Sequence, residues 1–235
     1  FEFIKPQISF EEIEGDSTYG NFVITPLERG YGVTLGNALR RVLLSSMPGI
    51  AIVAIDIEGV EHEYKALPGI IEDVTEIILN LKDIVFSIDE EELFKVTPQD
   101  SNEIYELSII AEGPRVVKAG DLTHDSLIQI VNPDKAIATL EEGGKFKARF
   151  YARRGVGYVS ADDNKVFTRD KIGQRIITRI PIDSIYTPIT KCRYEVEKTR
   201  VGENVDYDKL NIEVWTNGSI KADDAISLAS KFLID

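Results

Sequence analysis

Apolar residues recur at helical spacing between residues 34 and 47, where they form one face of an amphipathic helix. The apolar positions are Leu35, Ala38, Leu39, Val42 and Leu43. Thr34 is the expected N-cap, because its hydroxyl can accept a free backbone N–H of the first turn. Pro48 and Gly49 are expected to end the helix, since proline disfavours helical geometry in the preceding residue and glycine tolerates a positive φ.

The opposite face of this predicted helix carries Asn37, Arg40, Arg41 and Leu44. One interpretation is a solvated face with a single stray leucine, which is common on protein surfaces. The other is a docking face for a second protein, because arginine and apolar anchors are typical of interface hot spots. The pattern by itself leaves both open.

The rest of the chain reads as strands with two further helices. Amphipathic spacing predicts helices over 70–81 and 222–233, and the segment 153–173 reads as a long exposed loop. Short apolar and β-branched runs predict strands at 1–10, 19–26, 50–57, 189–196 and 210–215, with further strands between 84 and 152, one of them at 93–96. The chain is therefore predicted to be α+β, with helices near both ends and a β-rich middle.

Charge is distributed unevenly along the chain. The net charge is −13, which argues against general binding to nucleic acid. Residues 145–200 nevertheless hold 14 Lys/Arg and 6 Asp/Glu, a net of +8. This stretch is either ordinary surface patchiness or a basic face toward an acidic partner or a nucleic acid.

The sequence predicts a soluble, cytoplasmic protein. Cys192 is the single cysteine, which rules out an intrachain disulfide and fits a reducing compartment. No apolar run approaches the roughly 20 residues of a membrane helix, and the first ten residues do not read as a signal peptide. We therefore expect no membrane contact.

Candidate chemistry is sparse. The glycine-rich stretch 29–36 precedes a helix and could cradle a phosphate, but it lacks the Gly-Lys-Ser/Thr ending of a P-loop; its glycines could equally shape the turn into the helix. His62 and His124 lack zinc-ligand spacing, and the acidic residues from Glu58 to Asp73 have no fixed metal geometry. We expect no cofactor, no metal and no catalytic residue, so a stand-alone enzyme is not supported.

The stretch Leu27 to Gly49 resembles the signature of the bacterial RNA polymerase alpha subunit, in its N-terminal assembly domain. Further segments resemble that family in the same order: 57–63, 72–73, 122–125, 157–159, 182–188, 204–210 and 215–219. The resemblance covers essentially the whole chain. Two departures are Val156, where the family often has arginine, and a longer, more basic stretch from Asp170 to Arg179.

The resemblance implies a fold and a division into parts. Residues 1–48 and 173–235 are expected to form a ferredoxin-like dimerisation subdomain, interrupted by an inserted, mainly β subdomain over 49–172. A separate C-terminal domain that contacts DNA and activators is expected to be absent from this chain. Direct sequence-specific DNA contact is not expected from the part present.

The resemblance also implies a role as a non-catalytic alpha subunit. It would homodimerise and scaffold the beta and beta-prime subunits of a DNA-directed RNA polymerase whose active site lies on other subunits. The beta contact is expected at Arg40, Arg41, Leu44, His62 and Glu63, and the beta-prime contact at Lys82, Arg175 and Arg200. The dimer interface is expected at Leu35, Leu39, Val42, Leu43, Ile226, Ala229, Phe232 and Leu233. The alternative function is a nucleic-acid-binding module that uses residues 145–200.

Overall fold

A computed structural model of the chain describes residues 6–11, 16–94 and 103–234. The chain divides into two compact units: Phe1–Met47 with Thr187–Asp235 form unit 1, and Pro48–Tyr186 form unit 2. Residues 173–186, which the sequence analysis assigned to the first subdomain, belong to unit 2. The reason is that β12 (Arg179–Pro181) pairs with β3 (Pro48–Ile57), and β13 (Ser184–Ile185) pairs with β11 (Tyr158–Val159).

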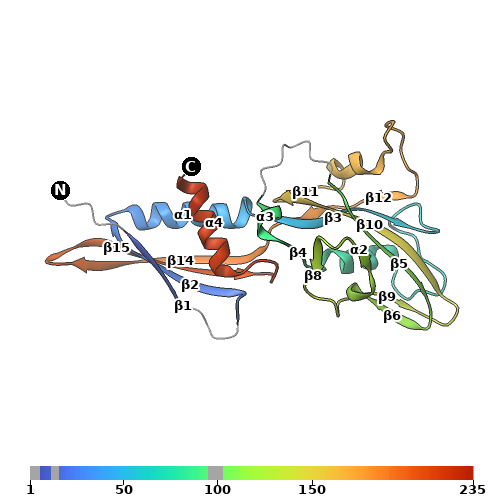
Figure 1. The fold of residues 1–235 in the computed structure, drawn as a ribbon, viewed down its shortest axis with the longest axis horizontal. Coiled ribbons are helices and arrows are strands. Elements are labelled where there is room, and N and C mark those ends of the chain that lie inside the picture. The colour runs from blue at the N-terminus through green and yellow to red at the C-terminus, as the bar shows by residue number, and fades with distance from the viewer. Residues whose placement is uncertain (1–5, 12–15, 95–102, 235) are drawn as a thin grey trace. The chain divides into compact units, whose positions relative to one another are not determined.

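Unit 1 is a four-stranded antiparallel sheet with two helices on one face (Figure 1). The strand order is β1-β2-β15-β14, formed by Gln7–Glu11, Tyr19–Glu28, Asn204–Thr216 and Ile189–Val201. Helix α1 (Tyr31–Ser45) packs on β14 and β15, and α4 (Ala222–Ile234) packs on α1 and on β15. Mixed helices and sheets confirm the predicted α+β class. Residues 1–5 of the predicted first strand lie outside the described residues.

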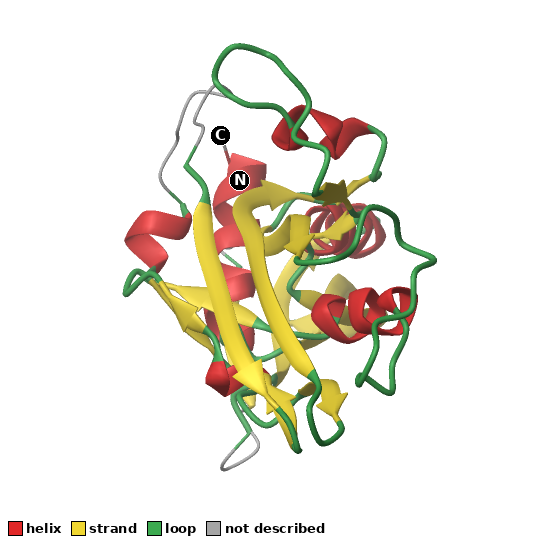
Figure 2. Ribbon diagram, turned by 90° about the vertical axis from the view of Figure 1, so that its right-hand side faces the viewer, coloured by secondary structure: helices red, strands yellow, loops and turns green. Residues whose placement is uncertain are grey.

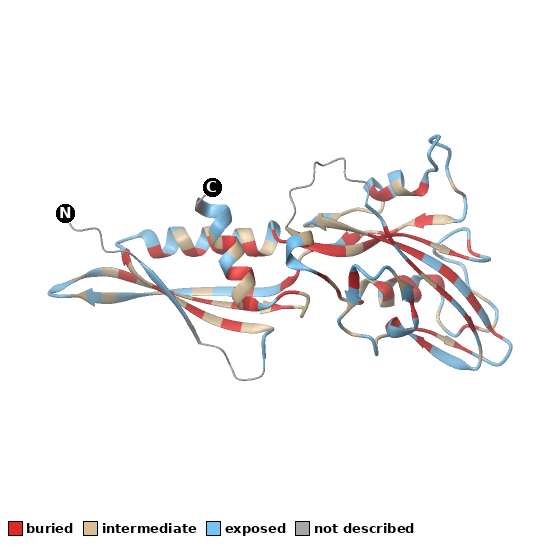
Figure 3. Ribbon diagram, viewed as in Figure 1, coloured by how far each residue is buried: buried red, intermediate tan, exposed pale blue. Residues whose placement is uncertain are grey.

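Alternation along the strands decides which face of this sheet is buried (Figure 3). On β15, Asp208, Leu210, Ile212 and Val214 are buried toward the helices, while the residues between them are partly exposed. Successive side chains of a strand point to opposite faces, so Lys209, Asn211 and Glu213 lie on the other face. The other face of the sheet is therefore polar.

Helix α1 begins three residues before the predicted N-cap. Its cap residue is Gly30, which has φ +87°, and no side chain of the cap accepts a helix N–H. The hydroxyl of Thr34 instead donates to the Gly30 carbonyl oxygen at 3.3 Å, within the first turn, so the prediction of Thr34 as N-cap was wrong. The helix ends at Ser45, and the strand β3 starts at Pro48.

The buried stripe of α1 is rotated from the predicted one, because two glycines belong to it. Its buried residues are Gly32, Gly36, Leu39 and Leu43, whereas Leu35, Ala38 and Val42 lie half-buried at its edges. A Cβ at position 36 would lie 2.6 Å from the Tyr194 ring, and one at position 32 would lie 2.6 Å from Val196 Cγ1. The glycines therefore allow the helix to lie close to β14.

Unit 2 is built on a five-stranded sheet of order β12-β3-β10-β5-β7 (Figure 2). Its remaining sheet strands are β5 (Tyr105–Glu112), β7 (Thr123–His124) and β10 (Lys145–Val156). One face carries the main core, which includes Ile55, Ile77, Leu107, Phe146 and Phe150. Around it lie α2 (Val74–Lys82), α3 (Glu90–Leu93), the 3₁₀ turn η1 (Ala119–Asp121) and the strand pairs β4–β8 (Phe86–Ile88, Ile128–Ile130) and β6–β9 (Arg115–Lys118, Ala136–Leu140).

Two local predictions in unit 2 were wrong at their boundaries. The helix predicted over 70–81 begins at Val74, because Asp73 caps it by accepting the Glu76 N–H at 2.8 Å. Glu72 instead accepts from the backbone N–H of Thr139 at 2.6 Å. A strand was predicted at 93–96, but Leu93 is the last residue of helix α3. Residues 95–96 lie outside the described residues.

The segment 153–173 is not one long exposed loop. It contains the end of β10, the strand β11 and a 3₁₀ segment, η2 (Asp163–Thr168). Asn164 is buried, and its Nδ2 donates to the Ile182 carbonyl at 2.7 Å and to Ser184 Oγ at 3.0 Å. These bonds fix η2 over a second small core of Val53, Ala54, Tyr151 and Tyr186.

Candidate protein–protein interface

The structure separates the roles of the two adjacent arginines on α1. Arg40 Nε donates to the Cys192 carbonyl oxygen on β14 at 3.2 Å, so this side chain is tied to its own sheet. Arg41 is exposed, and its side chain makes no hydrogen bond or ion pair with another described residue. Leu44, one turn away from Arg40, is half-buried. Both arginines are exposed, but Arg40 is bonded to its own sheet and Arg41 makes no bond within the described part of the chain.

The N-terminus of α1 is closed by a carboxylate from a distant strand. Oδ2 of Asp208 accepts the backbone N–H of Gly30 at 2.9 Å and that of Gly32 at 3.0 Å, and Lys198 Nζ lies 3.1 Å from Oδ1. Burial raises the pKa of Asp208, but the hydrogen bonds from Gly32, Lys198 and Gly30 outweigh it, so its pKa lies below the ordinary value. The glycine-rich stretch 29–36 thus already holds an anion of the protein itself, which argues against a phosphate site there.

Four of the eight predicted dimer-interface residues are buried inside the chain. Leu39, Leu43, Ile226 and Ala229 are at most 3% exposed, because this face of the two helices packs within unit 1. These four side chains are thus covered within the protomer, and their contact with a second copy stays a prediction. Surface remains at Leu35 and Val42, which are half-buried, and at Phe232 and Leu233, which are exposed.

In unit 2, two sets of residues predicted for different partners lie around one hollow. His62, Glu63 and Arg175 are all exposed and line a surface hollow of about 370 Å³ together with Tyr64, Lys165 and Ile180. The Tyr64 N–H donates to His62 Nδ1 at 3.3 Å, which orients the ring. Arg175, predicted to face beta-prime, is therefore grouped with His62 and Glu63, predicted to face beta.

The other two residues predicted for beta-prime lie in different units. Lys82, at the end of α2, forms an ion pair with Asp183, and both side chains are partly exposed. Arg200 is exposed on β14 and belongs to unit 1, whereas Lys82 and Arg175 belong to unit 2.

The basic stretch 145–200 contributes residues to both units. It is divided between the two units, and several of its side chains are occupied. Arg154 Nη1 donates to the Glu92 carbonyl at 2.6 Å, Arg193 Nε donates to Glu213 at 3.1 Å, and Lys198 pairs with Asp208. These bonds engage three of its cations within the chain, whereas nucleic-acid binding needs clustered cations that are free to meet phosphates.

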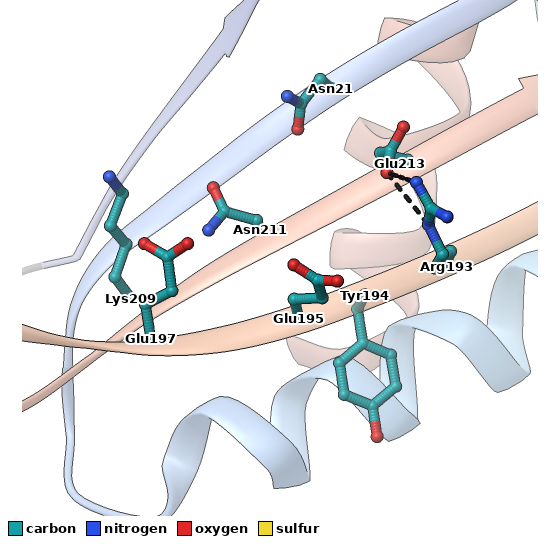
Figure 4. Close-up of a pocket in the computed structure, with 8 residues that line it drawn as sticks. All are labelled: Asn21, Arg193, Tyr194, Glu195, Glu197, Lys209, Asn211 and Glu213. Atoms are coloured by element: carbon teal, nitrogen blue, oxygen red, sulfur yellow. Dashed lines mark hydrogen bonds and ion pairs between the residues drawn. The ribbon is translucent and has the colours of Figure 1, made fainter.

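A polar hollow of about 270 Å³ lies on the open face of the unit 1 sheet (Figure 4). Tyr194 points away from it toward α1, where its hydroxyl donates to Asn37 Oδ1 at 2.9 Å. Arg193 and Glu213 pair across the hollow's edge, and Oδ1 of Asn21 is buried without a hydrogen-bond partner among the described residues. Its lining is Asn21, Arg193, Tyr194, Glu195, Glu197, Lys209, Asn211 and Glu213, a mixed-charge set that offers no nucleophile beside a general base.

Other features also lack reactive chemistry. Burial raises the pKa of the Cys192 thiol to about 11, although the positive charge of Arg40 lowers it in part. The thiol therefore stays protonated at neutral pH. His124 Nδ1 hydrogen-bonds the Asp125 carbonyl at 2.8 Å, within a turn. Across the described part of the chain, no three His, Cys, Asp or Glu side chains are grouped to hold a metal. No helix in the described ranges has both the length and the apolar character to span a membrane.

Sequence reasoning missed Asp208, although the sequence carries a signal for it. Asp208 lies on the same face of its strand as Leu210, Ile212 and Val214, so a charged residue stands on the buried face. A charge in such a position needs a dedicated partner. The partner, the start of α1, could not be identified from the alternation.

Comparisons with known proteins agree with this architecture. The model of the RNA polymerase Rpb3/RpoA insert domain matches residues 53–187. The chain is 51% identical over 234 residues to a DNA-directed RNA polymerase subunit alpha of Desulforamulus reducens, covering 99% of this chain and 68% of that relative. Subunits alpha of Alkaliphilus metalliredigens (50% over 232 residues; 99% and 68%) and Syntrophomonas wolfei (49% over 236 residues; 100% and 69%) are similarly close. With a family model over more than half of its length and such relatives over nearly all of it, the chain belongs to the family of DNA-directed RNA polymerase alpha subunits.

Proposed function

We propose that this chain homodimerises and serves as a non-catalytic scaffold on which the beta and beta-prime subunits of a bacterial RNA polymerase assemble. The observation that carries the proposal is on α1, where two exposed arginines differ: Arg40 is bonded to the Cys192 carbonyl and Arg41 makes no bond within the described structure. A rigid helix that presents an arginine beside a half-buried leucine has the composition of a protein-docking hot spot. The catalytic centre of the complex lies on other subunits.

Arg41 and Leu44 form the centre of the proposed beta contact. Arg41 reaches the partner, and Leu44 supplies apolar surface next to it. Arg40 contributes by fixing α1 against β14 and makes no contact with beta itself. The support for this division is that Arg40 Nε already donates to the Cys192 carbonyl, whereas Arg41 makes no bond within the described structure, although both side chains are exposed.

The hollow beside His62 and Glu63 is a second proposed docking surface. Because Arg175 lines the same hollow, we assign all three residues to one partner, beta. For beta-prime we retain Lys82 and Arg200. Asp183 belongs with Lys82, because their ion pair places both charges at one spot on the surface.

The homodimer contact uses the apolar surface that α1 and α4 leave exposed. Phe232 is 51% exposed and Leu233 39% exposed on the last turns of α4. In an isologous dimer each patch meets its own copy, so both protomers contribute the same apolar surface to the contact. Leu35 and Val42 on α1 complete the set.

The decisive experiment is light scattering after size exclusion on the chain mixed with the beta subunit of the same polymerase. The wild-type chain should run as a dimer and capture beta. Arg41→Ala should weaken capture by about 30-fold, the effect of removing a hot-spot side chain worth about 2 kcal/mol. Arg29→Ala is the matched control, because Arg29 is an exposed arginine just before the same helix. A monomer, or equal capture by wild type and Arg41→Ala, would refute the proposal.

A further inference from the structure

We infer that Asp208 is a positioning residue for partner docking: its carboxylate fixes the start of α1 and thereby the place at which Arg41 is presented. The inference rests on the proposed docking role of α1. It assigns a function to a residue that makes no contact with the partner. The argument depends on how α1 begins, what holds Asp208 and how the helix is restrained farther along.

Helix α1 has no capping group of its own. The cap residue is Gly30, and no side chain near it in sequence accepts a first-turn N–H. Unsatisfied N–H groups at a helix start are costly unless another acceptor is found. Asp208, which is 178 residues from Gly30 in the sequence, supplies that acceptor. Its Oδ2 accepts hydrogen bonds from the backbone N–H groups of Gly30 and Gly32. Its negative charge also lies at the positive end of the helix dipole.

Asp208 is held rigidly by the sheet that carries it. It lies within β15, opposite Leu27 on β2 and Lys198 on β14. Its side chain is 3% exposed, and Lys198 Nζ lies 3.1 Å from the oxygen that the helix does not use. A capping group on a paired strand has little freedom, so it fixes the helix rather than following it.

The contact tolerates little displacement of α1. A Cβ at position 32 would lie 3.0 Å from Asp208 Oδ2 and 3.1 Å from Asp208 Cβ. The first turn therefore already lies as near to the carboxylate as its backbone allows. Any other residue at this position would push the helix away from the carboxylate.

A second restraint lies next to Arg41. Arg40 bonds the Cys192 carbonyl, so α1 is held at its first turn by Asp208 and near its middle by Arg40. Arg41 directly follows this second point of attachment. Releasing the first turn lets the helix shift along and around its axis, and a misplacement of about 1 Å is enough to weaken a preorganised contact.

The test compares beta capture by the wild-type chain, Asp208→Asn and Asp206→Asn, at a temperature where unfolding curves show all three fully folded. Asp206→Asn is the matched control, because Asp206 is exposed on the same strand. Asp208→Asn should weaken capture about 10-fold, and hydrogen exchange at the Gly30 and Gly32 amides should accelerate while exchange at the β2 and β15 amides stays unchanged. Asp206→Asn should leave both readouts as in wild type.

Rescue separates positioning from a general loss of stability. In Asp208→Asn, the new amide nitrogen faces Lys198, so adding Lys198→Gln supplies an acceptor for it and should restore capture to within about threefold of wild type. If Asp208→Asn does not fold, Gly32→Ala tests the same contact, because its Cβ would lie 3.0 Å from Asp208 Oδ2 and displace the first turn, and it should weaken capture about tenfold. Unchanged capture by that variant would overturn the inference.

The remaining outcomes are distinguishable. If wild type captures beta and folded Asp208→Asn captures it equally well, the positioning role is wrong and the docking role stands. If the loss in Asp208→Asn is recovered by a stabilising osmolyte alone, Asp208 acts only through stability and the inference fails. If wild type captures no beta, the docking role itself is wrong, and the inference falls with it.

Discussion

Arg40 Nε, on helix α1, lies 3.2 Å from the carbonyl oxygen of Cys192 on strand β14. This single bond distinguishes two neighbouring arginines that are identical in type and adjacent in sequence. Arg40 attaches the helix to the sheet, and Arg41 makes no bond within the described structure. The structure therefore predicts that the two positions respond differently to the same substitution.

Arg40→Ala should lower the free energy of unfolding by about 1 kcal/mol, because it removes a hydrogen bond to a backbone carbonyl. Arg41→Ala should leave the unfolding curve unchanged, since its side chain makes no bond within the described structure. Urea unfolding followed by circular dichroism measures both. Equal destabilisation by the two variants would contradict the assignment.

Gly36→Ala should destabilise the protein although alanine is the better helix former. Helix propensity alone predicts a gain of up to about 1 kcal/mol. The new Cβ, however, would lie 2.6 Å from the Tyr194 ring, and overpacking of this kind costs about 1–3 kcal/mol. Thermal unfolding should therefore show a lower midpoint. Ser45→Ala, at an exposed position of the same helix, is the control and should be neutral or slightly stabilising.

Asp208 should make stability depend on pH in the acid range. Its pKa in the folded state lies below the ordinary value of 3.8, so the folded state favours the charged form. The stabilisation is therefore complete above the unfolded pKa, at about pH 4, and is lost as pH falls through the lower folded value. Urea unfolding at a series of pH values should show wild type and Asp208→Asn differing by a constant amount above pH 5 or so and converging below about pH 4. A gap that does not narrow in acid would show that the charge of Asp208 is not involved.

Asn164→Ala should destabilise unit 2 by about 2 kcal/mol. The substitution removes the donor to the Ile182 carbonyl and to Ser184 Oγ, and buried acceptors left unpaired are costly. Asp163→Ala, at the exposed neighbouring residue, should change stability little. Limited proteolysis should also cut η2 faster in Asn164→Ala than in Asp163→Ala. Equal cleavage would mean that the buried amide does not anchor this segment.

Phe232→Asp should convert the proposed dimer to a monomer, because it places a charge in the exposed apolar patch at the end of α4. Light scattering gives the mass directly. Ser227→Asp is the comparison on the same helix, since Ser227 is exposed but lies on a different side from Phe232. A Phe232→Asp chain that keeps the dimer mass would place the contact elsewhere.

Local patterns in the sequence were enough for the class of fold and for most elements. Short apolar and β-branched runs predicted β3 and part of β15, helical spacing predicted α1 and α4, and the motifs from Leu27 to Gly49 indicated the family. These signals depend on neighbours within a few residues. The errors were also local: a cap at Thr34 and a helix start at Ile70 compete with nearby alternatives that only packing decides.

The tertiary structure alone decided what the surface residues do. Gly30 and Asp208 are separated by 178 residues, and Arg40 and Cys192 by 152. Gly49 illustrates the same point: it was expected to end a helix with a positive φ, but a Cβ there would lie 1.9 Å from the Tyr186 carbonyl oxygen, so close backbone approach requires it.

The sequence by itself therefore determined the class of fold, most of the elements and the family, because periodicity and propensity act along the chain. Which arginine is free, which carboxylate caps α1 and which residues share a hollow with His62 depended on strand order and register. Those are set by pairings between distant segments, and no periodicity within one segment specifies which residue of another will face it.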